Sequence, residues 1–326
     1  MQISLSELKY RVEQAYSAIR CCRLCPRNCG VNRLRGELGV CHIGKIAKVA
    51  SHNIHTGEEP PISGTRGSGT IFFSSCNLRC KFCQNYPISQ LRHGKQATPE
   101  ELAKIMLSLQ AQGCHNINVV TGSHVVPQFL AGLYIAIIQT KVWRPRLGGS
   151  TSVGAMNLPI VWNSSGYDGL ESLKLLDGVV DIYMPDIKYS RNDVAEHYSA
   201  ATNYWDVVRP TIKEMHRQVG DLQIGEDGIA TRGLIIRHLV LPIPPRRWKP
   251  FHLRGGMGAG TEKVLKFIAD EISPNTYVSL MSQYFPAHNA TGHPTLGRRI
   301  TQGEWQSAGQ MLHKFGLANG WLQPLL

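Results

Sequence analysis

Three cysteines at C-x3-C-x2-C spacing are the residues of this chain best suited to chemistry. Cys76, Cys80 and Cys83 follow residues 70–74, an apolar, β-rich run that predicts a buried strand, so the thiols lie on the loop leaving that strand. Three thiolates so close in sequence can bind three corners of an iron–sulfur cubane, which normally takes four cysteine ligands. The remaining iron would then be open to chemistry. A zinc knuckle with a fourth ligand from elsewhere, or a redox pair, is the simpler alternative.

A second set of cysteines lies near the N-terminus, in a stretch rich in glycine. Cys22, Cys25, Cys29 and Cys41 stand at C-x2-C-x3-C-x11-C spacing. Four thiolates complete either a zinc site or an iron–sulfur cluster without an open position, and the spacing does not choose between them. Such a closed site would be structural or an electron relay. A few buried free cysteines are the alternative, and Cys21 is either spare or a substitute for Cys22.

Composition limits the class of protein. The chain has 326 residues, of which 42% are hydrophobic, so a large core can form. No run approaches the ~20 apolar residues of a membrane helix, so no membrane partner is expected. No signal peptide is evident at the N-terminus. Nine cysteines in an unexported chain favour metal or redox use over disulfides, and a cytoplasmic or equally reducing compartment is expected.

The net charge of +12 is concentrated in two stretches without acidic residues, 139–156 and 242–260. Seven basic residues lie in them: Lys141, Arg144, Arg146, Arg246, Arg247, Lys249 and Arg254. The second stretch also contains Trp248 and several prolines. Basic and aromatic side chains beside an active site would suit an acidic or peptide partner or single-stranded nucleic acid. A solvated loop is the alternative.

Helical and strand patterns alternate along the chain. Strands are predicted at 70–74, 116–120, 159–163, 179–184, 234–241 and 277–281. Helices are predicted at 5–20, 99–113, 127–140, 169–176, 204–219, 262–272 and 304–315. Such alternation indicates an α/β fold with a parallel sheet, in which active-site residues follow the carboxyl ends of the strands.

Residues 75–84 resemble the signature of the radical S-adenosylmethionine (SAM) superfamily, in which an aromatic residue precedes the third cysteine, as Phe82 does here. Residues 55–85 resemble the pyruvate formate-lyase activating enzyme-like family, and within it a PflX-type branch. The resemblance covers nearly the whole chain. It implies a partial (β/α)6 TIM-like barrel at 61–326, preceded by a helix and a Cys-rich metal-binding segment at 1–60.

The resemblance also implies cofactors and the residues that hold them. A 4Fe-4S cluster on the three cysteines would bind SAM, beside Phe82 and the residues that follow the strands. These are Thr121 and Ser123, where relatives often carry Gly-Gly-Glu, then Asn163, and then Asp186 and Lys188. Lys188 would pair with the SAM carboxylate, and Asp186 would order the site. Arg237 and His238 match the fifth strand of the family, and only one of them should line the barrel.

The resemblance therefore predicts a radical SAM oxidoreductase that cleaves SAM reductively and abstracts hydrogen from a protein or peptide. Its electron donor would be of the flavodoxin or ferredoxin type. Two alternatives remain at the level of sequence. One is an RNA-modifying radical SAM enzyme that uses the basic stretch 242–260, and the other is a non-enzymatic iron–sulfur or zinc binding protein.

Overall fold

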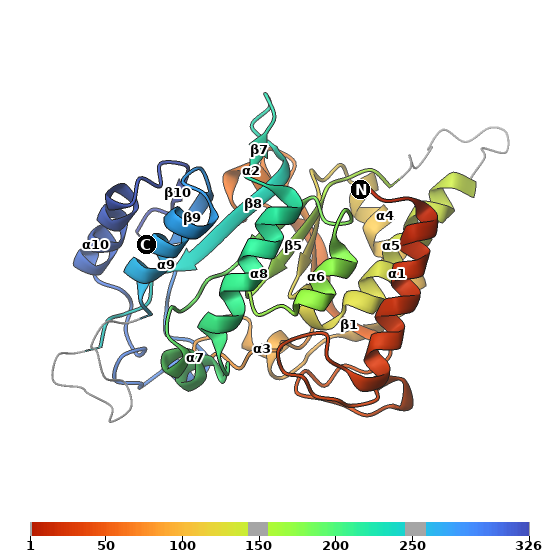
Figure 1. The fold of residues 1–326 in the computed structure, drawn as a ribbon, viewed down its shortest axis with the longest axis horizontal. Helices are drawn as coiled ribbons and strands as arrows, with labels where there is room; N and C mark the ends of the chain where they lie inside the picture. Colours follow the sequence, from red (N-terminus) through yellow and green to blue (C-terminus); the bar gives the residue numbers. More distant parts are fainter. Residues whose placement is uncertain (1, 143–155, 245–258, 326) are drawn as a thin grey trace.

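A curved, mainly parallel sheet forms the centre of the molecule (Figure 1). The computed structural model describes residues 2–142, 156–244 and 259–325. Within them seven strands run parallel in the order β10-β9-β8-β6-β5-β4-β2. They are β2 (Ser68–Phe73), β4 (Ile117–Val120), β5 (Ile160–Ser164), β6 (Ile182–Pro185), β8 (Ala230–Leu239), β9 (Tyr277–Met281) and β10 (Gly320–Leu322). The six predicted strands are all present, and β10 is an addition.

Three further strands run antiparallel to their partners: β1 (Ala47–His55), β3 (Lys95–Ala97) and β7 (Gln223–Ile224). The sheet ends at β10 on one side and at β3 on the other, so it is open and forms a partial barrel, as predicted. β1 was not predicted, because residues 51–54 are exposed and the strand lacks a buried alternation. Although β1 lies within residues 1–60, it pairs with β2 and belongs to the main sheet.

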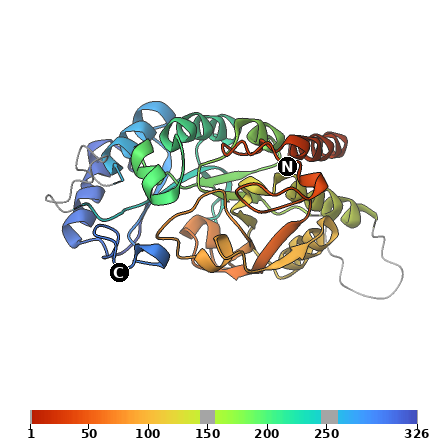
Figure 2. The ribbon, with the colours of Figure 1, turned by 90° about the horizontal axis from the view of Figure 1, so that it is seen from below.

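Helices cover the outside of the sheet (Figure 2). The α-helices of the described residues are α1 (Leu5–Ala18), α2 (Pro60–Ser63), α3 (Tyr86–Ser89), α4 (Pro99–Ala111), α5 (Val126–Val142), α6 (Leu170–Leu176), α7 (Asn192–Ser199), α8 (Tyr204–Val219), α9 (Thr261–Phe267) and α10 (Gln302–Lys314). The predicted start of α4 is confirmed, since Thr98 caps the helix and Glu101 completes a capping box. α7 was not predicted. No helix in the described ranges is long and apolar enough to span a membrane.

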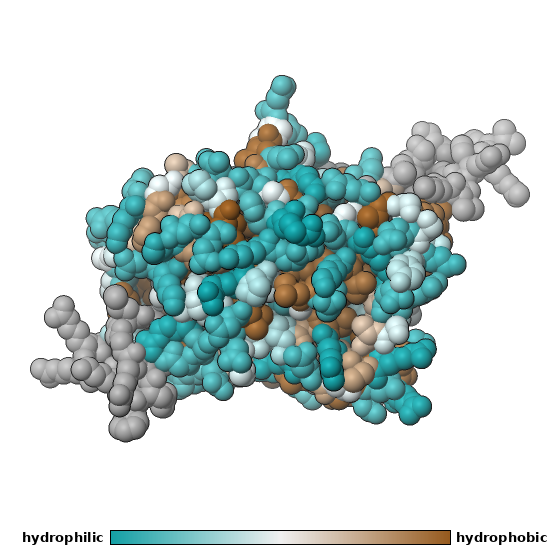
Figure 3. All heavy atoms as spheres, in the orientation of Figure 1, coloured by the Kyte–Doolittle hydropathy of each residue, from teal (hydrophilic) through white to brown (hydrophobic). Residues whose placement is uncertain are grey.

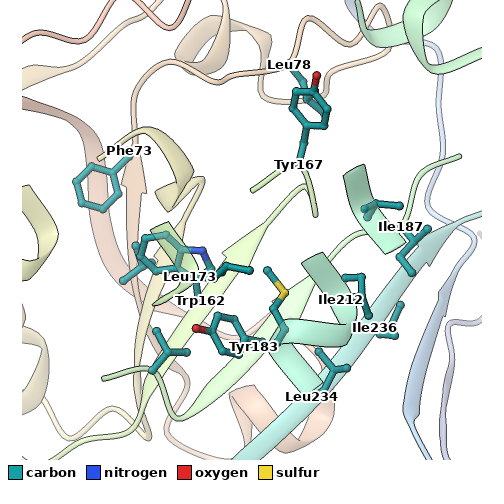
Figure 4. Packing of buried hydrophobic residues seen from close by; sticks show 14 of the residues in the cluster. Phe73, Leu78, Trp162, Tyr167, Leu173, Tyr183, Ile187, Ile212, Leu234 and Ile236 are labelled. Carbon is teal, nitrogen blue, oxygen red and sulfur yellow. The ribbon is translucent and has the colours of Figure 1, made fainter. Parts of the chain in front are cut away.

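Aromatic side chains fill the core between the sheet and the outer helices. Trp162 of β5 and Tyr183 of β6 are fully buried, and they lie among Leu173 and other aliphatic residues (Figure 4). Gly122 is required by this packing, because a Cβ atom there would lie 2.5 Å from the Trp162 ring. The visible outer surface is mostly hydrophilic, with small hydrophobic areas between polar ones (Figure 3).

The two ends of the barrel differ in what covers them. α2 lies at the end where β8 begins, and Ile62 packs there with a small buried cluster of β5, β6 and β8 residues. The carboxyl ends of the strands point to the opposite end, toward α3 and the Cys-rich N-terminal loop (Figure 1). Most of the two basic stretches, namely residues 143–155 and 245–258, lies outside the described residues. The site is therefore built from the loops at the α3 end.

Candidate active site at the carboxyl ends of the strands

The loop after β2 gathers the first three thiols. The Cys76 Sγ accepts a hydrogen bond from the backbone N–H of Leu78 at 3.3 Å, and the Cys83 Sγ lies 3.1 Å from Ser89 Oγ. Burial, together with the neighbouring Cys80 and Cys83, raises the pKa of Cys76 to about 12. The three thiols are thus close enough to repel one another as thiolates. A bound cationic centre would reverse this preference, so the set fits an iron–sulfur cluster.

α7 fixes the middle of this loop. The backbone N–H groups of Arg79 and Lys81 donate to the carbonyls of Ser199 and Tyr198, both at 2.8 Å. The Ser199 hydroxyl donates to Cys80 Sγ at 3.0 Å. This support was not predicted, because α7 is short and most of its residues are polar. Phe82, which precedes the third cysteine, is buried and packs edge-on against the ring of Tyr284.

A network of charged side chains lies at the strand ends. Arg237 of β8 donates from Nε to Asp186 Oδ1 at 2.8 Å, from Nη2 to Asn163 Oδ1 at 2.7 Å, and from Nη1 to Glu58 Oε2 at 3.3 Å. Lys188 pairs with the other oxygen of Asp186. The predicted residues Asn163, Asp186 and Lys188 are therefore brought together, with Arg237 at their centre.

The charges in this network depend on one another. Burial alone would raise the pKa of Asp186, but Arg237 and Lys188 hold it below its usual value. Burial would lower the pKa of Lys188, but Asp186 and Cys80 raise it above its usual value. Conversely, Lys188 opposes the rise that burial causes in the pKa of Cys80. This mutual influence places the thiol loop and the charged network in one site.

Glu58 is the member of the network whose role the sequence did not predict. It follows β1, and its Oε1 accepts a hydrogen bond from Asn118 Nδ2 at 3.0 Å. Burial raises the pKa of Glu58, against the influence of Arg237. The sequence feature that could have indicated it is the pair of acidic residues, Glu58 and Glu59, directly before the two prolines that begin α2. Its placement beside Arg237 depends on the register of β1 with β2, which local sequence does not reveal.

The two residues predicted after β4 have different surroundings. Thr121 has a left-handed backbone (φ 62°), and its N–H donates to the Asn163 carbonyl at 2.8 Å, so it lies next to the network. Ser123 is buried, and its hydroxyl hydrogen-bonds Asp168 instead. The Ser123 side chain is thus engaged within the core, whereas Thr121 stands at the strand end.

His238 points away from the network. Its Nδ1 lies 2.6 Å from the Ile187 carbonyl and its Nε2 lies 2.9 Å from Thr261 Oγ1. Arg237, the preceding residue, supplies the side chain that faces the strand-end charges. The alternation of β8 therefore divides this pair between the two faces of the sheet.

His238 should make the fold sensitive to acid. Burial lowers its pKa to about 4, against about 6.5 in an unfolded chain, so the unfolded chain binds a proton more readily. The contribution of His238 to the free energy of unfolding is therefore largest above about pH 6.5, the pKa of His238 in the unfolded chain, and it decreases as the pH falls toward 4. We expect about 2 kcal/mol of this loss between pH 7 and pH 5. Urea unfolding of the wild type and of His238→Gln at pH 7 and pH 5 measures this loss. An equal loss of unfolding free energy in both proteins would contradict the prediction.

The four N-terminal cysteines line one hollow. Cys22, Cys25, Cys29 and Cys41 lie around a space of about 350 Å³ that includes adjoining solvent, together with Arg33 and His124. Burial, with smaller contributions from Cys41 and Cys22, raises the pKa of Cys25 to about 12. Cys21 is exposed, and Cys114 is buried in the core.

Both thiol sets are gathered but not closed around a point. Among residues 2–142, 156–244 and 259–325, no three Cys, His, Asp or Glu side chains already form the ligand group of a single metal ion. The N-terminal loop is held by later parts of the chain. Ser172 Oγ donates to the Leu24 carbonyl at 2.6 Å, and Arg33 Nη1 donates to the His124 carbonyl at 3.0 Å.

The chain is similar to known proteins over much of its length. Residues 70–225 match the family model of the radical SAM superfamily. An uncharacterized protein of Methanocaldococcus jannaschii, MJ0674, is 32% identical over 317 residues, which cover 95% of this chain and 79% of that protein. The solved structure of TYW1 with a lysine-pyruvate adduct bound has a TM-score of 0.42 and 12% identity, covering 75% of this chain and 73% of that one. The chain therefore contains a radical SAM superfamily domain, over residues 70–225.

Proposed function

We propose that this radical SAM enzyme abstracts hydrogen from a protein or peptide, in the manner of the pyruvate formate-lyase activating enzyme-like family. One observation carries the proposal: Lys188 and Arg237 share the Asp186 carboxylate at the strand ends, near the loop that carries Cys80. A set of three thiols thus adjoins a cationic pair that is already balanced by one carboxylate. This is the arrangement needed to hold a cluster and the charged end of SAM together.

The residues divide this work by their chemistry. When bound, the 4Fe-4S cluster and SAM supply a 5′-deoxyadenosyl radical, which abstracts hydrogen. The three thiolates hold the cluster, while Lys188 and Arg237 offer cations to the SAM carboxylate. Asp186 keeps both cations in place, because it accepts from each of them. Thr121 and Asn163 stand beside them for the polar groups of SAM, and the buried Phe82 excludes water from the third cysteine.

Charge supports a macromolecular substrate. Residues 75–99, which include the whole thiol loop, contain no Asp or Glu but have Arg79, Lys81, Arg92 and Lys95. A field of one sign around the cluster loop raises the encounter rate with an acidic segment. The same field would favour an acidic electron carrier of the flavodoxin or ferredoxin type. We prefer a peptide to RNA because of the resemblance to activating enzymes.

Hydrogen transfer from a labelled substrate tests the proposal. The protein, reconstituted anaerobically with iron and sulfide, is mixed with SAM, dithionite and either protein or RNA from fully deuterated cells of the producing organism. We expect 5′-deoxyadenosine one mass unit heavier with the protein fraction only. Deuterium transfer from the RNA fraction alone would identify RNA, in place of a peptide, as the substrate. Absence of 5′-deoxyadenosine in every mixture would contradict SAM cleavage itself.

A further inference from the structure

The N-terminal hollow contains a buried cation, Arg33, which pairs with no carboxylate among the described residues. Arg33 is 1% exposed, and its guanidinium donates to the Gly44 carbonyl at 2.9 Å and to the His124 carbonyl at 3.0 Å. Its Nη1 also lies 3.7 Å from Cys22 Sγ. Arginine stays protonated in proteins, and a buried charge without an opposite charge costs several kcal/mol. Thiolates around the hollow would supply that charge.

A hydrogen-bond donor without an acceptor adjoins the same hollow. In the described residues, Arg27 Nη2 is buried and has no hydrogen-bond partner, and Arg27 lines the space among the four cysteines. His124 donates from Nε2 to the Ser74 carbonyl at 2.9 Å, which leaves Nδ1 of the neutral imidazole as an acceptor. A zinc ion brings no acceptor of its own. The sulfides of an iron–sulfur cluster are acceptors, and hydrogen bonds to them tune its potential.

One side chain separates the two thiol sets. Asn77 is 1% exposed, and Cys76 Sγ lies 3.8 Å from its Oδ1. Its side chain also hydrogen-bonds the Cys25 thiol. Arg27 Nε donates to the Asn77 carbonyl at 2.6 Å, and Arg79, from the thiol loop, donates to the Val40 carbonyl. The N-terminal set is therefore fixed directly against the loop of the first three cysteines.

We propose that Cys22, Cys25, Cys29 and Cys41 hold a second iron–sulfur cluster, which exchanges an electron with the three-cysteine cluster across Asn77. Reduction adds one negative charge to a cluster, and Arg27, Arg33 and Arg79 can offset it, whereas a zinc site would not change charge. A low-potential ferredoxin- or flavodoxin-type protein supplies the electron. The second cluster is oxidised as the first is reduced, and no bond or proton changes in the transfer. The proposal rests on the proposed function for its electron acceptor.

Metal analysis and electron paramagnetic resonance (EPR) test the cluster without any turnover. The full chain with Cys76, Cys80 and Cys83 all replaced by alanine is reconstituted anaerobically. We expect about four iron atoms per chain, no stoichiometric zinc, and an EPR signal after reduction with dithionite. The wild type should show a spectrum broadened by the second spin. Zinc in place of iron, or neither metal, would overturn the second cluster whatever the enzyme does with SAM.

A yield measurement tests the electron transfer. The protein is reduced, freed of excess reductant and then given SAM. The wild type should form about twice as much 5′-deoxyadenosine per chain as Cys29→Ser, whose half-exposed thiol lies at the edge of the hollow. Equal yields, with EPR showing that only the wild type retains the second cluster, would overturn the transfer. If Cys29→Ser does not fold, persistence of the wild type's reduced second-cluster signal after SAM addition overturns it equally. If the triple variant binds iron but the wild type forms no 5′-deoxyadenosine, the proposed function is contradicted and the second cluster is not.

Discussion

Replacing Cys76, Cys80 or Cys83 by alanine is expected to abolish 5′-deoxyadenosine formation while the protein remains folded. Each of the three thiols supplies one corner of the cluster, and two corners do not retain it. The Sγ atoms of all three are engaged locally by Leu78, Ser199 and Ser89, so each substitution leaves the rest of the loop paired. Chromatographic measurement of 5′-deoxyadenosine after addition of SAM and dithionite, with circular dichroism for the fold, gives both results.

The matched control for these variants is Cys21→Ala. Cys21 is exposed and lies outside both thiol sets, so its product yield should equal that of the wild type. A Cys80 variant that still formed 5′-deoxyadenosine at the wild-type yield would refute the assignment of the cluster to this loop. Loss of folding in all three variants would instead mean that the thiols are required for packing.

Arg237→Met is expected to reduce the free energy of unfolding by about 3–5 kcal/mol, the usual cost of removing one partner from a buried ion pair. The substitution leaves Asp186 with Lys188 only, and it leaves one oxygen of the buried Glu58 without its cation. Three hydrogen bonds of the guanidinium are also lost, including that to Asn163. Urea unfolding at pH 7 measures the change, and SAM affinity should fall in parallel.

Arg217→Met serves as the control for charge removal. Arg217 also pairs with two carboxylates, those of Glu214 and Asp177, but its side chain is 59% exposed. Water replaces these contacts readily, so its unfolding should change little. If Arg237→Met unfolded at the same urea concentration as the wild type, the buried network would contribute no net stability, and its purpose would be restricted to binding.

Local pattern was sufficient to predict the repeating part of the fold. Each predicted parallel strand is short, apolar and followed by turn residues, because strands buried on both faces need no polar alternation. The helix Tyr204–Val219 was predicted to the residue, since its apolar positions recur at helical spacing. β1 and α7 were missed because their side chains are largely polar and their positions depend on tertiary contacts with β2 and the thiol loop.

The chemistry of the site was predictable by type but not by partner. Cysteine spacing identified both thiol sets, and position after a strand identified Asp186 and Lys188. Nothing in the sequence connects Arg237 with Glu58, which lie 179 positions apart and meet only when the barrel is assembled. The contact between Asn77 and Cys25 was hidden for the same reason. Long-range charge pairing and loop docking arise only in the folded structure.

The long-range ties of the N-terminal loop also determine when it can mature. The Leu24 carbonyl is held by Ser172, and Arg33 is held by the carbonyl of His124, so residues made much later complete the enclosure of the thiols. Roughly 130 residues separate the last cysteine of this set from Ser172, which corresponds to on the order of 10 s of synthesis. The first thiols to leave the ribosome are therefore among the last to be shielded. During that interval they are open to oxygen and to competing metals.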